Sequence, residues 1–393
     1  MIHHVYLTPG MFGFARLASF DYFAHVEHGL QRRFLAAGQQ VELHVADVAP
    51  TASIRRRAAK LAEAVGRTAG DEGAIHLLGH STGGLDARFV ASPGSQFSNA
   101  DHALRWLPRL RSITTMNTPH YGTPLASFFA TAKGQRALHA LSAFTIIGLS
   151  LGRRPLGLAS MLISLVGRSD HAVGLQLRLL DRSVDSVLGL VDEARSPEVR
   201  SFLDAIKGDQ GAVLQASPEA MDLMVAGFED RKGVVYQCTA SMAPHPSPAK
   251  WLRTLPAPWR TTSLTLFAAL HRLTGHYGQG YPCGAVQGDV AFAGASTEAT
   301  LARMMGATPD LHDNDGIVPL RSQLWGTLVW AGLGDHLDVL GHYRDDRPPA
   351  GTELRHRDWL TSGSDFSHPD FEKLLDAIVT GMLESTHVAA DVE

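Results

Sequence analysis

The residues with the clearest chemical potential in this sequence surround one serine. Ser81 is the central residue of Gly79-His80-Ser81-Thr82-Gly83, a G-x-S-x-G motif that follows the apolar run 74–78. This context predicts a buried strand, a sharp turn and a helix, with the serine hydroxyl exposed on the turn as a nucleophile. Glycine suits the flanking positions, because side chains there would clash where strand and helix meet. The motif alone also fits a glycine-rich turn with an incidental serine.

A serine hydroxyl becomes a good nucleophile when a histidine takes its proton and an acid orients that histidine. On a fold with this turn, the acid and then the histidine follow the serine along the chain. Acidic residues fall on the polar loop 312–316, where Asp313 and Asp315 are both candidates. His336 follows the apolar run 328–334, which predicts the last core strand, and His342 is a second candidate for the base.

The oxyanion formed in such a reaction needs backbone N–H donors. We expect one donor from Thr82, the residue after the serine. The loop 8–14 follows the first predicted strand, and Met11 is its candidate for the second donor. This loop also fits an ordinary turn containing Pro9 and Gly10.

The elements that must position these residues alternate between strand and helix over residues 1–120. Strands are expected at 5–7, 41–45, 74–78 and 112–117, and helices at 22–37, after an N-cap at Ser53, and at 84–91. Such alternation implies parallel strands joined by crossover helices. Functional residues gather at the carboxyl ends of such strands, which is where Ser81 falls.

The pattern changes after Pro124. Residues 125–231 predict helices and no strand, with apolar runs at 138–151 and 156–166. Each run is shorter than the ~20 residues that span a bilayer, so a transmembrane hairpin is not expected. We interpret the insertion as a helical cap or lid over the site, and a pair of ordinary buried helices is the alternative.

Strand character returns at 233–238, and an amphipathic helix follows near 262–273. That helix fits either the site entrance or plain core packing. The sequence therefore predicts an α/β fold with a mainly parallel central sheet flanked by helices. We divide it into a first core part at 1–124, a helical cap at 125–231 and a second core part at 232–393.

The charge of the chain bears on which partners it can bind. A net charge of −4 and a pI near 6.6 give no electrostatic basis for nucleic-acid binding. The basic run 55–57 is interpreted as a solvated helix face.

Cys238 and Cys283 could form one disulfide, but we prefer two free thiols. The N-terminus lacks a signal-peptide pattern, which favours the cytoplasm, or secretion if a signal was removed.

Several segments together resemble bacterial triacylglycerol lipases and esterases of the α/β-hydrolase superfamily. They are residues 8–13, 78–88, 115–124, 217–221, 314–319 with 322–326, and 336–338. The resemblance covers the core well and the stretch 125–216 poorly. It implies an α/β-hydrolase fold with an inserted lid, and hydrolysis of hydrophobic acyl esters through an acyl-enzyme intermediate.

Carried over residue by residue, the resemblance implies Ser81 as nucleophile, Asp315 as acid and His336 as base. Asp315 is preferred to Asp313 because it directly precedes Gly-Ile-Val, as in the family. Met11 and Thr82 remain the expected oxyanion donors. The sequence departs from the family at Pro9, which replaces a common histidine. The Pro-Gly pair at this position resembles the corresponding segment of lecithin–cholesterol acyltransferase-like enzymes.

The resemblance requires no cofactor, but related lipases bind a structural calcium near the catalytic histidine. Asp338 matches one ligand position, and Asp289 is a weaker match for the second. A surface carboxylate is the alternative interpretation of Asp338.

The expected substrate is a small-molecule or lipid ester, with transient contact with a lipid interface. An acyltransferase would share the same triad, and so would a phospholipase or lipid deacylase acting at membranes. A non-catalytic binding protein ranks last, because no member of the triad is missing from the sequence.

Overall fold

A six-stranded parallel sheet forms the centre of the molecule. The computed structural model describes residues 1–11, 16–17, 20–97, 103–151, 156–167, 196–276, 283, 293–345, 356, 358 and 360–388. The strand order is β4-β1-β5-β6-β7-β8, and each neighbouring pair is parallel. The bounds are β1 Ile2–Thr8, β4 Gln40–Val45, β5 Ala74–His80, β6 Leu110–Met116, β7 Val235–Met242 and β8 Thr327–Leu333. A short antiparallel pair, β2 (Arg16–Leu17) and β3 (Phe20–Asp21), lies outside this sheet.

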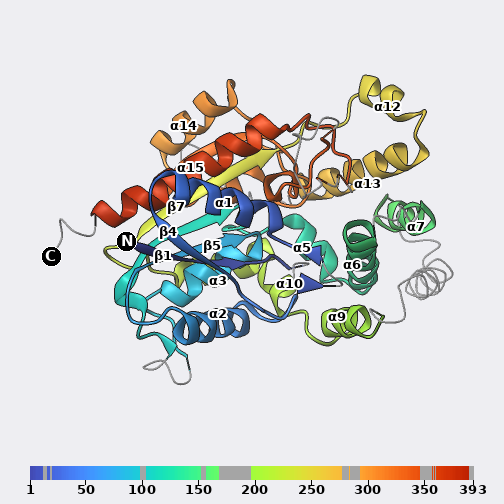
Figure 1. Ribbon diagram of the computed structural model, residues 1–393. Helices are drawn as coiled ribbons and strands as arrows, with labels where there is room; N and C mark the ends of the chain where they lie inside the picture. The colour runs from blue at the N-terminus through green and yellow to red at the C-terminus, as the bar shows by residue number, and fades with distance from the viewer. Residues whose placement is uncertain are drawn as a thin grey trace.

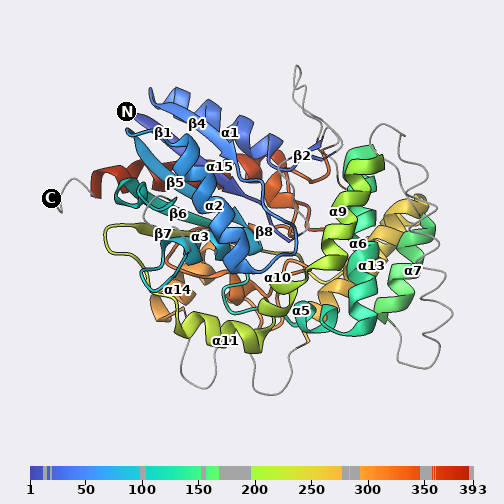
Figure 2. The same ribbon diagram turned by 90° about the horizontal axis from the view of Figure 1, so that it is seen from below.

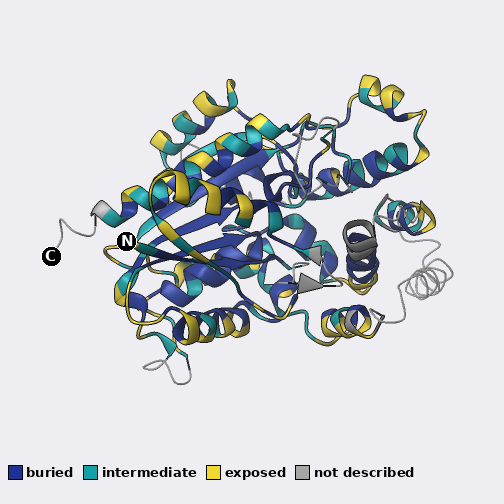
Figure 3. Cartoon of the chain, in the orientation of Figure 1, coloured by how far each residue is buried: buried dark blue, intermediate teal, exposed yellow. Residues whose placement is uncertain are grey.

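Helices cover both faces of the sheet (Figure 1). Alternate side chains of β1 point to opposite faces, so Val5 and Leu7 pack in one core and Tyr6 in another. The first core includes α1 (Ala24–Ala36) and α15 (His368–Val388). The second includes α2 (Ile54–Thr68) and α3 (Thr82–Ala91). Figure 3 shows the strands buried between these layers. The predicted α/β class with a parallel sheet flanked by helices is confirmed.

A separate group of helices packs beyond one end of the sheet (Figure 2). Within the described residues between β6 and β7 the regular elements are helical: α5 Pro124–Phe129, α6 Ala132–Leu151, α7 Leu156–Gly167, α9 Ser196–Gly208, α10 Gly211–Gln215 and α11 Pro218–Ala226. Helix α13 (Pro258–Thr274) joins α5, α6, α7 and α9 in one apolar core. Residues 168–195 of the predicted cap lie outside the described residues, and its proposed limits stay a prediction.

Most predicted elements differ from the structure only at their ends. Ser53 caps α2 as predicted, since its side chain accepts the Arg56 backbone N–H. Helix α3 starts at Thr82, two residues earlier than predicted, and β7 extends to Met242. Helices α14 (Ala295–Met305) and α15 were not predicted from the sequence. The remaining short elements are α12 Pro248–Thr254, η1 Leu107–Arg109, η2 Leu320–Gln323 and η3 Asp338–Leu340.

The sequence also led to predictions about membrane-spanning helices and about the two cysteines. In the part of the chain that the structure describes, no helix combines the length and apolar character needed to cross a membrane. Cys238 and Cys283 are both buried free thiols, as preferred from the sequence. Burial raises the pKa of the Cys238 thiol to about 12, so this thiol is not activated as a nucleophile.

Candidate active site

Ser81 lies on a strained turn between β5 and α3. Its φ of 55° and ψ of −131° are rare for a residue with a side chain. The flanking glycines make the turn possible. A Cβ at Gly79 would lie 2.3 Å from the Gly83 backbone, and one at Gly83 would lie 2.1 Å from the Thr8 carbonyl oxygen. The serine therefore stands at the carboxyl end of its strand, where the motif placed it.

Asp315 and His336 meet at the same end of the sheet. The imidazole Nδ1 of His336 lies 2.7 Å from Oδ2 of Asp315. Asp315 is 1% exposed, and its Oδ1 accepts the backbone N–H groups of Ile317 at 2.9 Å and Val318 at 2.7 Å. The backbone N–H of His336 also donates to the Asp315 carbonyl at 3.0 Å. Because Nδ1 donates to the carboxylate, Nε2 is the nitrogen left to accept a proton.

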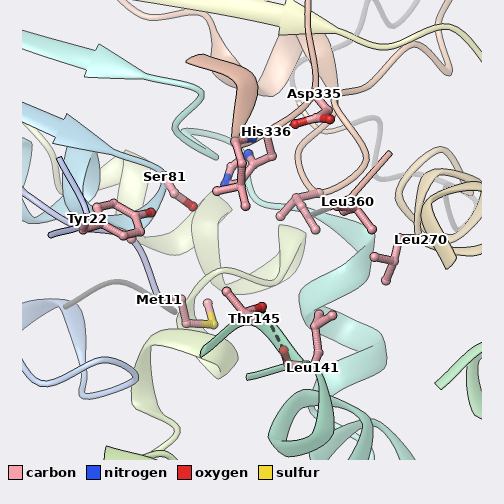
Figure 4. Close-up of a pocket in the computed structure, with 12 residues that line it drawn as sticks. Met11, Tyr22, Ser81, Leu141, Thr145, Leu270, Asp335, His336 and Leu360 are labelled. Carbon is pink, nitrogen blue, oxygen red and sulfur yellow. Dashed lines mark hydrogen bonds between the residues drawn. The ribbon is translucent and has the colours of Figure 1, made fainter. Parts of the chain in front are cut away.

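Ser81 and His336 line one pocket, and their side chains face each other there (Figure 4). The pocket holds about 560 Å³ of empty space, including its open mouth. Most of its wall is apolar, contributed by Met11, Leu141, Leu270, Ile317, Leu337 and Leu360. Leu141 belongs to α6 and Leu270 to α13, so the helical group beyond the sheet forms part of this wall. The helix predicted near 262–273 therefore reaches the site.

The alternative acid and base are engaged elsewhere. Asp313 Oδ2 accepts the backbone N–H of Asp310 at 2.6 Å. His342 packs edge-on against His25, with ring centroids 5.7 Å apart. Of the candidates named from the sequence, the structure brings together Ser81, Asp315 and His336.

The loop expected to supply the second oxyanion donor is described only as far as Met11. Thr82 is the first residue of α3, directly after Ser81, and Met11 lines the pocket. Gly10 packs so closely on Ser81 that a Cβ at position 10 would lie 2.7 Å from the Ser81 Cβ. Residues 12–14 of the predicted loop lie outside the described residues.

Asn117 also binds the Asp315 carboxylate, a contact that was not predicted from the sequence. Its side-chain amide donates to Asp315 Oδ2 at 2.8 Å and to the Ser241 hydroxyl at 2.6 Å. Its φ of 49° turns the chain sharply just after β6. Asparagine tolerates this region better than most residues, so its place directly after a core strand is the signal that could have identified it.

His80 binds the backbone carbonyl of His336, and Tyr22 in turn binds His80. His80 Nε2 donates to the His336 carbonyl at 2.9 Å, so its Nδ1 accepts the Tyr22 hydroxyl at 2.8 Å. Burial holds the pKa of His80 well below its usual value, which keeps it neutral and able to do both. The sequence offered one signal, the histidine inside the G-x-S-x-G motif.

A buried ion pair lies close to the turn that carries Ser81. Arg57 is wholly buried, and its Nη2 lies 2.8 Å from Asp86 Oδ2. The same nitrogen donates to the Pro9 carbonyl. The predicted solvated face is therefore wrong for Arg57, although its neighbours 55 and 56 are exposed. Arg57 lies on the side of α2 that packs against α3, whereas its neighbours point to solvent.

Asp338 is not the surface carboxylate that the sequence analysis offered as an alternative. It is 3% exposed, and its Oδ2 accepts the Asp335 backbone N–H at 2.8 Å and the Ser364 hydroxyl at 2.7 Å. Burial, together with the nearby Asp335 carboxylate, raises the pKa of Asp338 well above its usual value. This carboxyl group has the contacts of a loop anchor.

The predicted calcium site at Asp338 is only partly covered by the described residues. Within the described ranges, Asp338 belongs to no group of three histidine, cysteine or acidic side chains close enough to share an ion. The proposed second ligand, Asp289, lies outside the described residues. Calcium at Asp338 therefore stays a prediction.

Part of the chain is similar in sequence to a known lipase. No family model matches the chain. A triacylglycerol lipase of Vibrio cholerae serotype O1 is 31% identical over 150 residues, which is 38% of this chain. The match spans only 41% of that lipase's own length. The predicted resemblance to a bacterial triacylglycerol lipase is confirmed over this part of the chain.

Two solved structures align with most of the chain. EstA from Clostridium botulinum gives a TM-score of 0.48 at 18% identity, covering 94% of this chain and 87% of EstA. Staphylococcus hyicus lipase gives a TM-score of 0.46 at 14% identity, covering 98% of this chain and 96% of the lipase.

Proposed function

We propose that this protein is a serine carboxylic-ester hydrolase acting on esters with apolar acyl groups. The observation that carries the proposal is the 2.7 Å contact between His336 Nδ1 and Asp315 Oδ2 in the pocket that also contains Ser81. The sequence similarity to a triacylglycerol lipase supports ester chemistry in particular.

The first half of the reaction forms an acyl-enzyme. His336 Nε2 takes the hydroxyl proton of Ser81 as Oγ bonds to the ester carbonyl carbon. The carbonyl electron pair moves onto oxygen, and the N–H groups of Thr82 and Met11 stabilise that oxyanion. The carbonyl then re-forms, the bond to the alkoxy group breaks, and His336 gives its proton to the departing alcohol. Asp315 holds the imidazole tautomer and stabilises the imidazolium throughout.

The second half uses water and restores the enzyme. His336 takes a proton from water while the water oxygen attacks the acyl carbon. The second tetrahedral intermediate collapses, the bond to Ser81 Oγ breaks, and His336 returns the proton to Oγ. The carboxylic acid leaves, and every step uses side chains and backbone groups of this chain.

The apolar wall supports a hydrophobic acyl group. Burying one methylene is worth about 0.8 kcal/mol, so each methylene that the pocket accepts raises kcat/KM by up to about fourfold. A series of p-nitrophenyl esters of increasing chain length measures this preference. A rate that falls steadily from acetate onward would contradict it.

Replacing the nucleophile tests the assignment. Ser81→Ala should abolish turnover of p-nitrophenyl butyrate and labelling by a fluorophosphonate probe, with unchanged circular dichroism. The matched control is Ser160→Ala, an exposed serine on α7, which should behave as the wild type. Turnover retained by Ser81→Ala would overturn the proposal.

Analysis of the reaction products distinguishes hydrolysis from acyl transfer. With an added acceptor alcohol, a hydrolase releases mainly free acid, whereas an acyltransferase forms mainly the new ester. A dominant ester product would replace hydrolase with acyltransferase and leave the triad in place.

Transient contact with a lipid interface is part of the proposal. Leu252 and Leu255 support it, because they are 66% and 60% exposed on α12 and in the turn that leads to α13. Wild-type protein should co-sediment with phosphatidylcholine vesicles more than a Leu252→Glu, Leu255→Glu variant. Equal co-sedimentation would remove these residues from the interface.

A further inference from the structure

A second cluster of ligand-forming side chains lies on the other side of the sheet from α1, away from the Ser81 pocket. It consists of His4 on β1 and Glu42 and His44 on the edge strand β4. The parallel register pairs His4 with Glu42, and His44 follows two residues along β4 on the same face. The register therefore places all three side chains at the same level on one face of the sheet.

The two histidines turn ring nitrogens toward the same carboxylate oxygen. His4 Nδ1 lies 3.2 Å from Glu42 Oε2, and His44 Nε2 lies 3.7 Å from that same atom. Both nitrogens are buried and have no hydrogen-bond partner. The Glu42 oxygen is close to His4 Nδ1 but is not placed to accept a hydrogen bond from it. A cation between these three atoms would satisfy all of them at once.

The tautomer of His4 is also the one that a metal ligand needs. Its Nε2 lies 3.1 Å from the Glu72 carbonyl oxygen, which can only accept, so Nε2 carries the proton. The remaining nitrogen of a neutral imidazole then presents a lone pair to the carboxylate. Metal-binding histidines commonly donate their second nitrogen to a backbone carbonyl in this way. This Nδ1 atom is itself buried, so it has no contact with water in this arrangement.

The two distances from the histidine nitrogens to the Glu42 oxygen are close to those around a tetrahedral ion. Zinc bonds to imidazole nitrogen and carboxylate oxygen are about 2.0–2.2 Å long, which separates neighbouring ligand atoms by about 3.3–3.6 Å. The two measured separations, 3.2 and 3.7 Å, lie close to that range, and all three atoms lie within 4.8 Å of one another. Tyr6 stacks on the His44 ring at 4.7 Å and holds it in place.

We propose that His4, Glu42 and His44 bind one divalent transition-metal ion of the zinc class. Two imidazoles and one carboxylate suit zinc, whereas calcium and magnesium prefer oxygen ligands throughout. The Glu42 side chain is 55% exposed, so solvent can supply the fourth ligand. None of the three residues lines the Ser81 pocket, and the ion ties the edge strand β4 to β1.

Metal binding by chelator-stripped protein tests this site. Zinc bound per chain is measured by equilibrium dialysis and calorimetry for the wild type, Glu42→Gln and His44→Gln. The matched control is His28→Gln, an exposed histidine on α1. Wild type and control should each bind one more zinc ion per chain than the two site variants. Cobalt should add visible absorption bands of a four-coordinate site to the same two proteins only.

Two further measurements keep the test decisive. Each protein is unfolded thermally without metal to show that the variants fold, and zinc should raise the midpoint for wild type and control alone. Equal zinc stoichiometry in all four proteins would overturn the proposal, because the ions would then sit on other histidines. A wild type that binds no zinc would also overturn it and leave an ion pair between Glu42 and a protonated histidine.

Discussion

Arg57 Nη2 lies 2.8 Å from Asp86 Oδ2, and the same nitrogen donates to the Pro9 carbonyl beside the nucleophile. One guanidinium group thus joins α2, α3 and the turn after β1. Both side chains of the pair are 0% exposed. Asp86 Oδ1 has no hydrogen-bond partner, so the arginine is the principal stabilising contact of that carboxylate.

Removing the arginine should therefore destabilise the fold strongly. Arg57→Met leaves the buried Asp86 carboxyl group without its partner, which costs about 3–5 kcal/mol in the free energy of unfolding. Urea denaturation measures this loss, and Arg55→Met, an exposed neighbour, should stay within about 0.5 kcal/mol of the wild type. Adding Asp86→Leu to Arg57→Met should recover part of the loss. Equal denaturation midpoints for Arg57→Met and the wild type would contradict this role.

The two aspartates of the acid loop should differ sharply in their effect on turnover. Asp315→Asn removes the carboxylate that fixes the His336 tautomer, and should lower kcat on the order of 10³–10⁴-fold. Asp313→Asn affects a carboxylate bonded only to the Asp310 backbone among the contacts described, and should leave kcat within about twofold of the wild type. The reverse result would exchange the two assignments. Steady-state kinetics on p-nitrophenyl butyrate decides between them.

A single methyl group at position 10 should disturb the nucleophile. The Cβ of Gly10→Ala would lie 2.7 Å from the Ser81 Cβ, so one of the two must move. A displacement near 1 Å costs up to about 10²-fold in rate, and we expect kcat to fall while the melting temperature changes little. Gly157→Ala, with open space around it, is the control and should leave kcat unchanged. Unaltered kcat in both variants would show that the turn relaxes freely.

Buried neutral histidines should make the fold sensitive to acid. Burial lowers the pKa of His76 to about 3 from its ordinary 6.5. A lowered folded-state pKa contributes stability above pH 6.5, and this contribution is lost as the pH falls toward 3. In that window His76 adds a slope of up to about 1.4 kcal/mol per pH unit, because the unfolded chain binds the extra proton.

His76→Gln isolates this contribution. Glutamine keeps a donor and an acceptor for Ser112 and His3 but does not titrate. Unfolding free energies measured at pH 7 and pH 4.5 should differ less for the variant than for the wild type. An unchanged difference would assign the acid sensitivity to other groups.

The sequence predicted the parts of the site that depend on local pattern. Glycines at 79 and 83 sit two residues either side of Ser81, and their necessity follows from a strand and a helix meeting at one turn. Asp315 could be chosen because it lies on a polar loop directly before Gly-Ile-Val, and His336 because it follows an apolar run. The parallel sheet followed from the alternation of strands and helices.

The residues that were missed depend on partners far along the chain. Arg57 reads as part of a basic run, and only the packing of α2 on α3 turns it toward Asp86, 29 residues away. Asn117 and Asp315 are 198 residues apart, and His80 and His336 are 256 apart. No periodicity or spacing in one sequence reports such contacts, because they are created by the register of the sheet.

These long separations also set the order in which the pocket is assembled. The turn at Ser81 follows β5, whereas Asp315 and His336 flank β8, the last strand of the sheet order. A chain is synthesised from its N-terminus and folds progressively as it emerges, so the turn can form before those two residues have been made. Ser81 can meet His336 only once β8 has joined the sheet.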